Sequence, residues 1–175
     1  VDFALLKDGK LIEFHKDNDN TKFLVGDIYL AKIRKTMPAL NAAFLNVGYK
    51  KDAFLHYHDL GPKFSTLQKF IKGVSIGRIK NFSLNNYKFE EEIDKNGAIS
   101  DVLSPNQSVL IQIVKEPIST KGPRVTSELS VAGRFLVLVP FSSRISISQK
   151  IEDQKEKDRL KRLVKSITPK GFGVI

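Results

Sequence analysis

Short apolar runs separated by turn residues recur along the first two thirds of the chain. The segment FALLKDGKLIEF, at 3–14, divides around a Lys-Asp-Gly-Lys turn, and an Asp-Gly pair between apolar residues is a strong hairpin signal. Further runs predict strands at these positions: 27–35, 42–47, 53–58 and 108–116. Short antiparallel strands at this spacing, separated by Gly, Pro, Asn and Asp, are typical of a small barrel.

A long polar excursion interrupts the barrel pattern between residues 60 and 107. A structureless loop of this length is uncommon in a compact domain. We therefore expect the excursion to carry local structure or to fold on binding. A short helical turn is predicted from Ser100 to Leu103.

The last third of the chain predicts a strand, an amphipathic helix and a second strand. GRFLVLVP, at 133–140, predicts a buried strand. From Glu152 to Ile167, apolar residues keep helical spacing among charges, which predicts a surface amphipathic helix. It leads into a last strand, GFGVI. Because the chain begins at Val1 and stops on this strand-like segment, we expect it to be a piece of a longer protein.

Two phenylalanines occupy the outward side of their predicted strands. If Ala43 and Leu45 face the core, strict alternation turns Phe44 toward solvent, and Phe54 is turned outward by the same argument. OB-fold barrels bind single strands across one outer face with exposed rings as platforms, so we predict that both rings stack on RNA bases. The alternative is that a second domain covers them.

The chain is strongly basic, with 29 Lys and Arg against 19 Asp and Glu and a net charge of +10. This excess argues for a polyanionic partner: nucleic acid, an acidic protein or anionic lipid. The absence of cysteine excludes disulfides, thiolate nucleophiles and Cys-based zinc sites, and it fits a reducing, cytoplasmic location. The run FLVLV, at 135–139, is far shorter than the roughly 20 residues of a spanning helix, so we expect no membrane segment and no signal peptide.

Residues 60–89 give the strongest local charge signal. They include no acidic residue and hold these basic and aromatic ones: Lys63, Lys69, Lys72, Arg78, Lys80 and Lys88, with Phe64, Phe70, Phe82, Tyr87 and Phe89. Cations neutralise phosphates and rings stack on unpaired bases, so we predict phosphate contacts at the first five basic residues. An equally weighted alternative is that the rings form the excursion's own core and the lysines are a solvated face.

Histidines and carboxylates give weaker signals. His56 and His58 are spaced for one face of a strand, but with His15 they make a poor zinc site, which leaves a hydrogen-bonding turn or an RNA-facing imidazole. Consecutive carboxylates in a polar loop splay apart, so a solvated segment is expected at Glu90, Glu91, Glu92 and Asp94. There is no Gly-rich phosphate loop and no serine elbow. We predict no catalytic residue, metal site or cofactor in this chain.

Two long segments carry a family resemblance. VGDIYLAKIRKTMPALNAAFLNVGYKKDAFLHYHDL and LIQIVKEPISTKGPRVTSELSVAGRFLVLVP resemble the ribonuclease E/G family, bacterial endoribonucleases of RNA decay and ribosomal RNA maturation. The likeness covers nearly the whole chain and implies incomplete α+β subdomains on either side of a five-stranded OB-fold barrel of the S-one type. Residues 1–24 would be a hairpin of a ribonuclease-H-like subdomain. Residues 25–127 would form the barrel, with 60–107 inserted, and residues 128–175 would begin a sensor of an RNA 5′-monophosphate.

The resemblance also implies roles for particular residues. Phe44, Phe54 and Lys121, the lysine of the TKG turn, would contact single-stranded RNA. In the sensor, Val137 matches a strand valine, and Lys150 lies beside Gln149, which stands where the family has an arginine. The parent protein would cleave single-stranded RNA with magnesium, as a homo-oligomer. This chain would bind RNA without cutting it.

Two other functions stay open at this point. A stand-alone OB-fold module, acting in translation or as an RNA chaperone, would share the barrel, although AGRFLVLVP favours the nuclease. A protein-interaction domain would instead use the basic excursion to dock an acidic partner. RNA competition for that surface would separate this last function from the other two.

Overall fold

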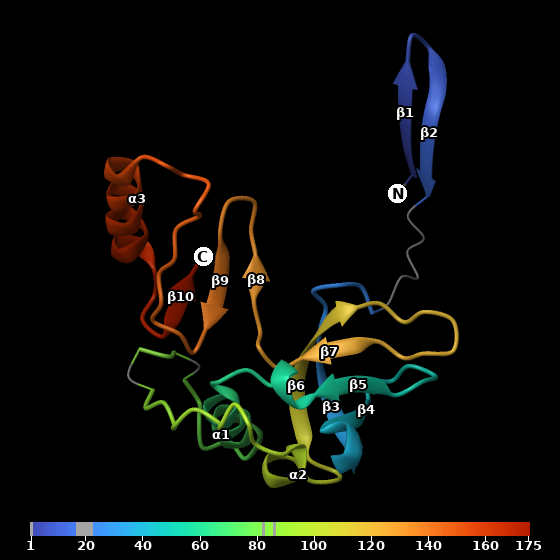
Figure 1. The fold of residues 1–175 in the computed structure, drawn as a ribbon, viewed down its shortest axis with the longest axis vertical. Helices are drawn as coiled ribbons and strands as arrows, with labels where there is room; N and C mark the ends of the chain where they lie inside the picture. The colour runs from blue at the N-terminus through green and yellow to red at the C-terminus, as the bar shows by residue number, and fades with distance from the viewer. Residues whose placement is uncertain (1, 17–22, 82, 86) are drawn as a thin grey trace.

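The computed structural model describes these residues: 2–16, 23–81, 83–85 and 87–175. An N-terminal hairpin, a barrel and a C-terminal sheet with one helix follow one another along the chain (Figure 1). The hairpin pairs β1 (Asp2–Lys7) with β2 (Lys10–Lys16), and its turn residues Asp8 and Gly9 have φ values of 52° and 74°. Two left-handed residues are typical of the tight turn that Asp-Gly predicts, so the predicted hairpin is confirmed.

A closed five-stranded barrel forms the centre of the fold, as predicted. Its strands run in the order β3-β4-β5-β7-β6 and have these bounds: β3 Ile28–Met37, β4 Ala42–Asn46, β5 Ala53–His56, β6 Ser108–Lys115 and β7 Arg124–Thr126. The β5–β7 pair is parallel and the other neighbours are antiparallel, which is consistent with an OB-fold. Inward side chains fill the interior, among them Ile33, Leu45, Leu55, Ile111 and Ile113.

A 3₁₀ turn cuts short the third predicted barrel strand. β5 ends at His56 and η2 (Tyr57–Asp59) follows, so the expectation that His56 and His58 lie along one strand is wrong. The Tyr57 N–H donates to the Asn41 carbonyl at 2.8 Å, and the Tyr57 ring is buried in the barrel core. The chain therefore turns at this point to place an aromatic ring beneath the barrel.

The excursion contains a helix that was not predicted. α1 (Phe64–Ser75) presents Phe64, Leu67 and Ile71 on one side at helical spacing. Phe64 enters the barrel core, and Leu67 belongs to a second apolar cluster outside the barrel. The expectation that the excursion carries local structure is confirmed.

A short helix packs into the barrel core where a helical turn was predicted. α2 (Ile99–Val102) places the buried Ile99 in the same apolar cluster as the barrel strands. Asn41, which follows η1 (Pro38–Leu40) with a φ of 45°, holds this helix. Its Oδ1 accepts from the Ile99 N–H at 2.7 Å, and its amide donates to the Gly97 carbonyl at 3.1 Å.

The C-terminal sheet differs from the buried strand predicted for 133–140. Its order is β10-β9-β8, with these bounds: β8 Val131–Ala132, β9 Val137–Pro140 and β10 Phe172–Val174. The Gly133 N–H donates to the Leu136 carbonyl at 2.8 Å, so a hairpin turn divides the apolar run and leaves Phe135 86% exposed. β9 is half-buried, and the prediction of a continuous buried strand is wrong.

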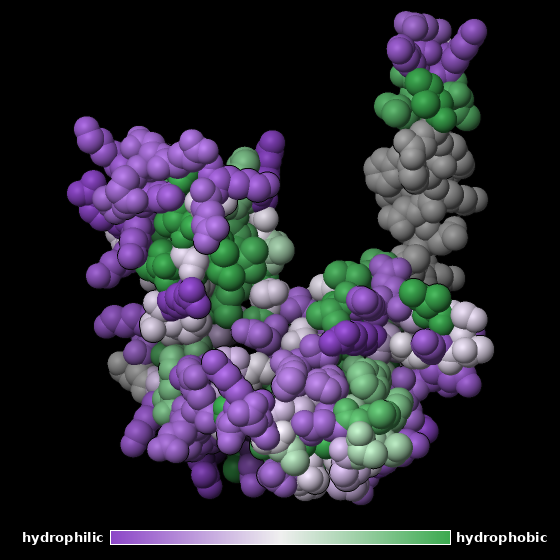
Figure 2. Space-filling view, viewed as in Figure 1, coloured by the Kyte–Doolittle hydropathy of each residue, from purple (hydrophilic) through white to green (hydrophobic). Residues whose placement is uncertain are grey.

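The remaining C-terminal predictions are confirmed. α3 (Gln154–Ile167) lies within the predicted range, and β10 is the expected last strand. Asp153 caps α3 by accepting from the Lys155 N–H at 2.9 Å. Figure 2 shows the hydrophilic surface of α3 beside the more apolar sheet. Among the described residues, no helix has the length and apolar character needed to cross a membrane.

Replacing Asn41 by alanine should destabilise the barrel by about 1–3 kcal/mol, because two partly buried main-chain groups of the α2 segment would lose their partner. Urea denaturation followed by circular dichroism measures this. The exposed Asn85, changed to alanine in parallel, should shift the midpoint far less. Equal midpoints for the two variants would show that Asn41 does not anchor α2.

Candidate nucleic-acid interface

A hollow of about 520 Å³ lies on the outer side of the barrel, beside β4, β5 and the segment that precedes β7. We call it the Phe44 hollow. It is lined by Lys35, Phe44, Lys51, Asp52, Phe54, Thr120, Lys121, Gly122 and Arg124. Three predicted RNA contacts, Phe44, Phe54 and Lys121, therefore come together in one place.

The two phenylalanines form one aromatic surface. Phe44 and Phe54 are direct cross-strand partners, with ring centroids 5.6 Å apart at an interplanar angle of 67°. Both rings are half-buried, whereas the alternate residues Leu45 and Leu55 are fully buried. The outward placement is confirmed, and base stacking on these rings stays a prediction.

Positive charge surrounds the rings. The Lys35 ammonium lies 5.3 Å from the Phe44 centroid, and Lys51, Lys121 and Arg124 share the hollow. Its one carboxylate, Asp52, pairs with Arg34 at 3.3 Å. Sequence reasoning missed Lys35, Lys51 and Arg124, because each belongs to a different segment and only barrel closure collects them.

A glycine brings Lys121 to this surface. Main-chain bonds join Ile118 and Lys121 at 2.9 and 3.2 Å in a tight turn, and Gly122 follows. A Cβ at Gly122 would collide with the Asp52 carbonyl oxygen, so the turn packs directly on the β4–β5 connection. The TKG motif thus positions its lysine through close backbone approach.

The aromatic residues of the excursion form a core. Phe64 is 3% exposed within the barrel cluster, while Phe70, Tyr87 and Phe89 surround Phe141 with centroids 5.4 to 6.3 Å apart. These rings are therefore core residues, but the core is shared with the barrel and with Phe141, so the alternative of a core belonging to the excursion alone is only partly correct. Phe141 comes from beyond β9, a partner that the local sequence does not reveal. Phe82 lies outside the described residues.

Two excursion lysines have acidic partners. Lys63 pairs with Glu92 at 3.0 Å, and Lys69 pairs with Glu90, whose hydrogen bond raises the pKa of Lys69. Glu92 is exposed although paired, so the expectation of a solvated carboxylate segment holds for it, whereas Glu90 is half-buried beside Lys69. Residues 60–89 contain no acidic residue, but the folded chain brings Glu90 and Glu92 next to these two lysines.

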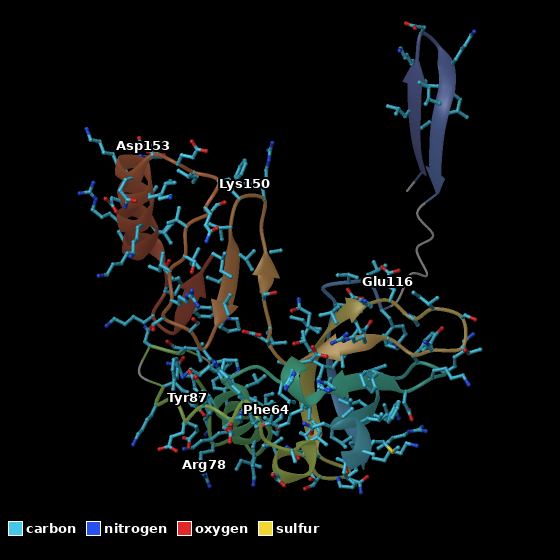
Figure 3. All side chains as sticks on the ribbon, viewed as in Figure 1. Phe64, Arg78, Tyr87, Glu116, Lys150 and Asp153 are labelled. Atoms are coloured by element: carbon cyan, nitrogen blue, oxygen red, sulfur yellow. The ribbon has the colours of Figure 1, made fainter. Side chains whose placement is uncertain are left out.

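The excursion and the Phe44 hollow occupy separate surfaces. α1 packs on the outer side of β6, whereas the hollow lies at β4, β5 and β7. Figure 3 shows Arg78 at the outer edge of the excursion and Glu116, which leads into the Lys121 turn, on another side of the barrel. The structure does not bring Lys72, Arg78 and Lys80 into the hollow, and their phosphate contacts stay a prediction.

The predicted sensor residues lie in the C-terminal part. Val137 begins β9, and its N–H donates to the Ile175 carbonyl at 2.8 Å. Gln149 and Lys150 are exposed in the segment before α3. Figure 3 labels Lys150 at the edge of the C-terminal part. Their role in 5′-phosphate binding stays a prediction.

The carboxylate that follows the histidine pair is already engaged. No group of three or more His, Cys, Asp and Glu side chains that could hold a metal occurs within the described residues. Asp59 is engaged by Arg124 in a bidentate pair at 2.9 to 3.2 Å. Burial, aided by the Asp94 carboxylate, raises the pKa of Tyr57, whose O–H donates to the Asp94 carbonyl.

Taken together, these features define a basic OB-fold-type barrel with an aromatic hollow. Residues 130–175 match the family model described as the Ribonuclease E/G family. The chain is 36% identical over 152 residues to ribonuclease E of Synechocystis sp., covering 86% of this chain and 18% of that protein. It is 30% identical over 172 residues to ribonuclease G of Escherichia coli K12 and 32% identical to that of Haemophilus influenzae, covering 98% of this chain and 31% of each relative.

The chain therefore belongs to the ribonuclease E/G family. It spans between about a fifth and a third of the length of these relatives.

Alanine at Phe44 or Phe54 should leave the free energy of unfolding nearly unchanged, since both rings face outward. Alanine at the fully buried Leu45 should cost about 2–5 kcal/mol. Thermal and urea melts of the three variants test this contrast. A Phe44 variant that melts as early as the Leu45 variant would mean that the ring supports the core.

Proposed function

We propose that this chain supplies the single-stranded-RNA-binding surface of an endoribonuclease of the ribonuclease E/G family. The observation that carries the proposal is the Phe44 hollow, which combines two outward rings with four cations. The relatives' name, ribonuclease, supports RNA as the substrate. RNA decay and ribosomal RNA processing, a cytoplasmic location and a homo-oligomeric parent are part of the same proposal.

Two kinds of interaction bind RNA in the Phe44 hollow: base stacking and charge neutralisation of phosphates. Unpaired bases stack on Phe44 and Phe54, and each stacked base contributes about 1–3 kcal/mol without strong sequence preference. Lys35, Lys51 and Lys121 neutralise the phosphates that flank these bases. The paired state of Asp52 reduces the repulsion that its carboxylate would exert on RNA.

Among the described residues, no group of three or more His, Cys, Asp and Glu side chains that could hold a metal ion occurs. Glu90 and Glu92, the densest carboxylates in sequence, are in ion pairs with lysines. The proposal assigns no metal-dependent step to this chain. Its task is to hold RNA for a magnesium-dependent catalytic site in the parent.

The proposal also assigns each part of the chain to a subdomain of the parent protein. Residues 1–24 belong to a ribonuclease-H-like subdomain, 25–127 to the S-one-type barrel with its insertion, and 128–175 to a 5′-monophosphate sensor. The family match at 130–175 supports the last assignment and weighs against a stand-alone barrel in translation or RNA chaperoning. Val137 and Lys150 would contribute to the sensor, with Gln149 in place of the family's arginine.

The chain should retain labelled unstructured RNA in magnesium buffer without cutting it. Alanine at both Phe44 and Phe54 should weaken binding by about 1–3 kcal/mol per lost stacked base. Fluorescence anisotropy gives the affinity, and gel analysis of the same samples reports cleavage. Alanine at the exposed Phe135 is the matched control, because this ring lies on the β8–β9 turn. If the double variant binds RNA with wild-type affinity, the proposed function is contradicted.

Salt dependence separates the two basic surfaces. Glutamine at Lys35, Lys51 and Lys121 should reduce the magnitude of the slope of log affinity against log salt by about 0.7 for each lost phosphate contact. A second variant carries glutamine at all five predicted excursion contacts: Lys63, Lys69, Lys72, Arg78 and Lys80. If its slope equals that of the wild type, the excursion serves an acidic protein partner or is a solvated face.

A further inference from the structure

The aromatic surface of the Phe44 hollow continues along β5 onto two imidazoles. Phe54 and His56 are two residues apart on β5 and project on the same outer side, and their cross-strand partners are Phe44 and Ala42. Ala42, the cross-strand partner of His56, is small and fully buried. His58 follows in η2, with its ring centroid 5.0 Å from that of His56 at an interplanar angle of 77°.

The hydrogen bonds leave both imidazoles able to meet a ligand. His56 Nδ1 accepts from the His58 N–H at 3.2 Å, so the proton of a neutral His56 ring lies on Nε2 as a donor. His56 is half-buried and the His58 side chain is exposed. The turn requires only a hydrogen-bond acceptor at position 56, which asparagine would also supply. The turn therefore does not explain why both position 56 and position 58 carry an imidazole ring.

The spacing suits a nucleic-acid strand. Residues i and i+2 of a strand are separated by about 7 Å, roughly twice the 3.4 Å rise per nucleotide of a stacked strand. An extended RNA strand can thus place one base at Phe54 and the next at His56. Beyond His58, the adjoining hollow of about 400 Å³ contains three carboxylates, Glu92, Asp94 and Glu128, against one cation, Lys95, so its charge disfavours phosphate. The favourable path therefore ends at the imidazoles.

The geometry points to a second nucleotide subsite at His56 and His58, where the base that follows the Phe44–Phe54 position stacks on the exposed His58 ring and accepts a hydrogen bond from the His56 Nε2–H. This inference rests on the proposed RNA binding at the Phe44 hollow. Arg124 is the β7 partner of Phe54, and its guanidinium pairs with Asp59, which follows His58 in η2. This ion pair links the strand of the first subsite to the turn of the second.

The test compares decauridylate binding by wild type and by His56→Asn/His58→Ser. Asparagine keeps an acceptor for the His58 N–H, so the turn is retained while both rings are lost. Affinity should fall about fivefold or more, the lower limit for one stacked base. Adding Phe44→Ala should multiply this loss, because separate subsites contribute independently. His58→Tyr with His56 intact keeps a ring and should retain most of the affinity.

His15→Asn, on β2 outside the barrel, is the matched control and should bind as the wild type does. Melting curves confirm that each variant is folded before its affinity is compared. If the double histidine variant binds decauridylate as the wild type does while Phe44→Ala weakens binding, the second subsite is wrong and the proposed function stands. If Phe44→Ala also leaves decauridylate affinity unchanged, both the second subsite and the proposed function are wrong.

Discussion

The register between β4 and β5 is the constraint on which both the barrel and its outer surface depend. Inside the barrel, Ala43 lies opposite Leu55 and Leu45 lies opposite Ala53, so each cross-strand pair combines one large and one small side chain. A slip of one residue would turn the inward leucines to solvent and the outward rings to the core. The interior volume therefore fixes which face carries Phe44.

A second apolar cluster joins segments that are distant in sequence. Phe141, with a left-handed φ of 56°, directs its ring back from the end of β9 toward α1 and the following segment. Phe70, Tyr87 and Phe89 pack on it edge to face. Aromatic rings that bury 150–250 Å² each are costly to expose, so this cluster holds the excursion against the C-terminal part. The excursion owes its order to residues outside itself.

Local signals predicted much of the fold. Asp8-Gly9 is sufficient for a hairpin turn, and alternation in β4 and β5 sets the outward side of Phe44 and Phe54 without further information. The family's barrel and its TKG lysine were likewise readable from motifs. These are features whose physical cause lies within a few neighbouring residues.

The remaining errors arose where a local pattern was too short or was hidden by polar residues, or where the partner of a residue is distant in sequence. β7 has only three residues, too few to show alternation, and the apolar run at 133–140 gives no sign of the turn that divides it. α1 was recognisable from the spacing of Phe64, Leu67 and Ile71 but was hidden by the polar character around it. Lys63 and Lys69 read as free cations because their acidic partners lie more than 20 residues further on.

The position of β6 in the barrel has a consequence for synthesis on the ribosome. β6 pairs with both β3 and β7, yet about 50 residues separate it from β5 along the chain. At 5–20 residues per second, roughly 3–10 s pass between the emergence of β5 and that of β6. During this interval the nascent three-stranded meander has open edges, and α1, made in the same interval, cannot dock until its β6 surface arrives. The excursion therefore sets the time for which an unfinished barrel must avoid pairing with other chains.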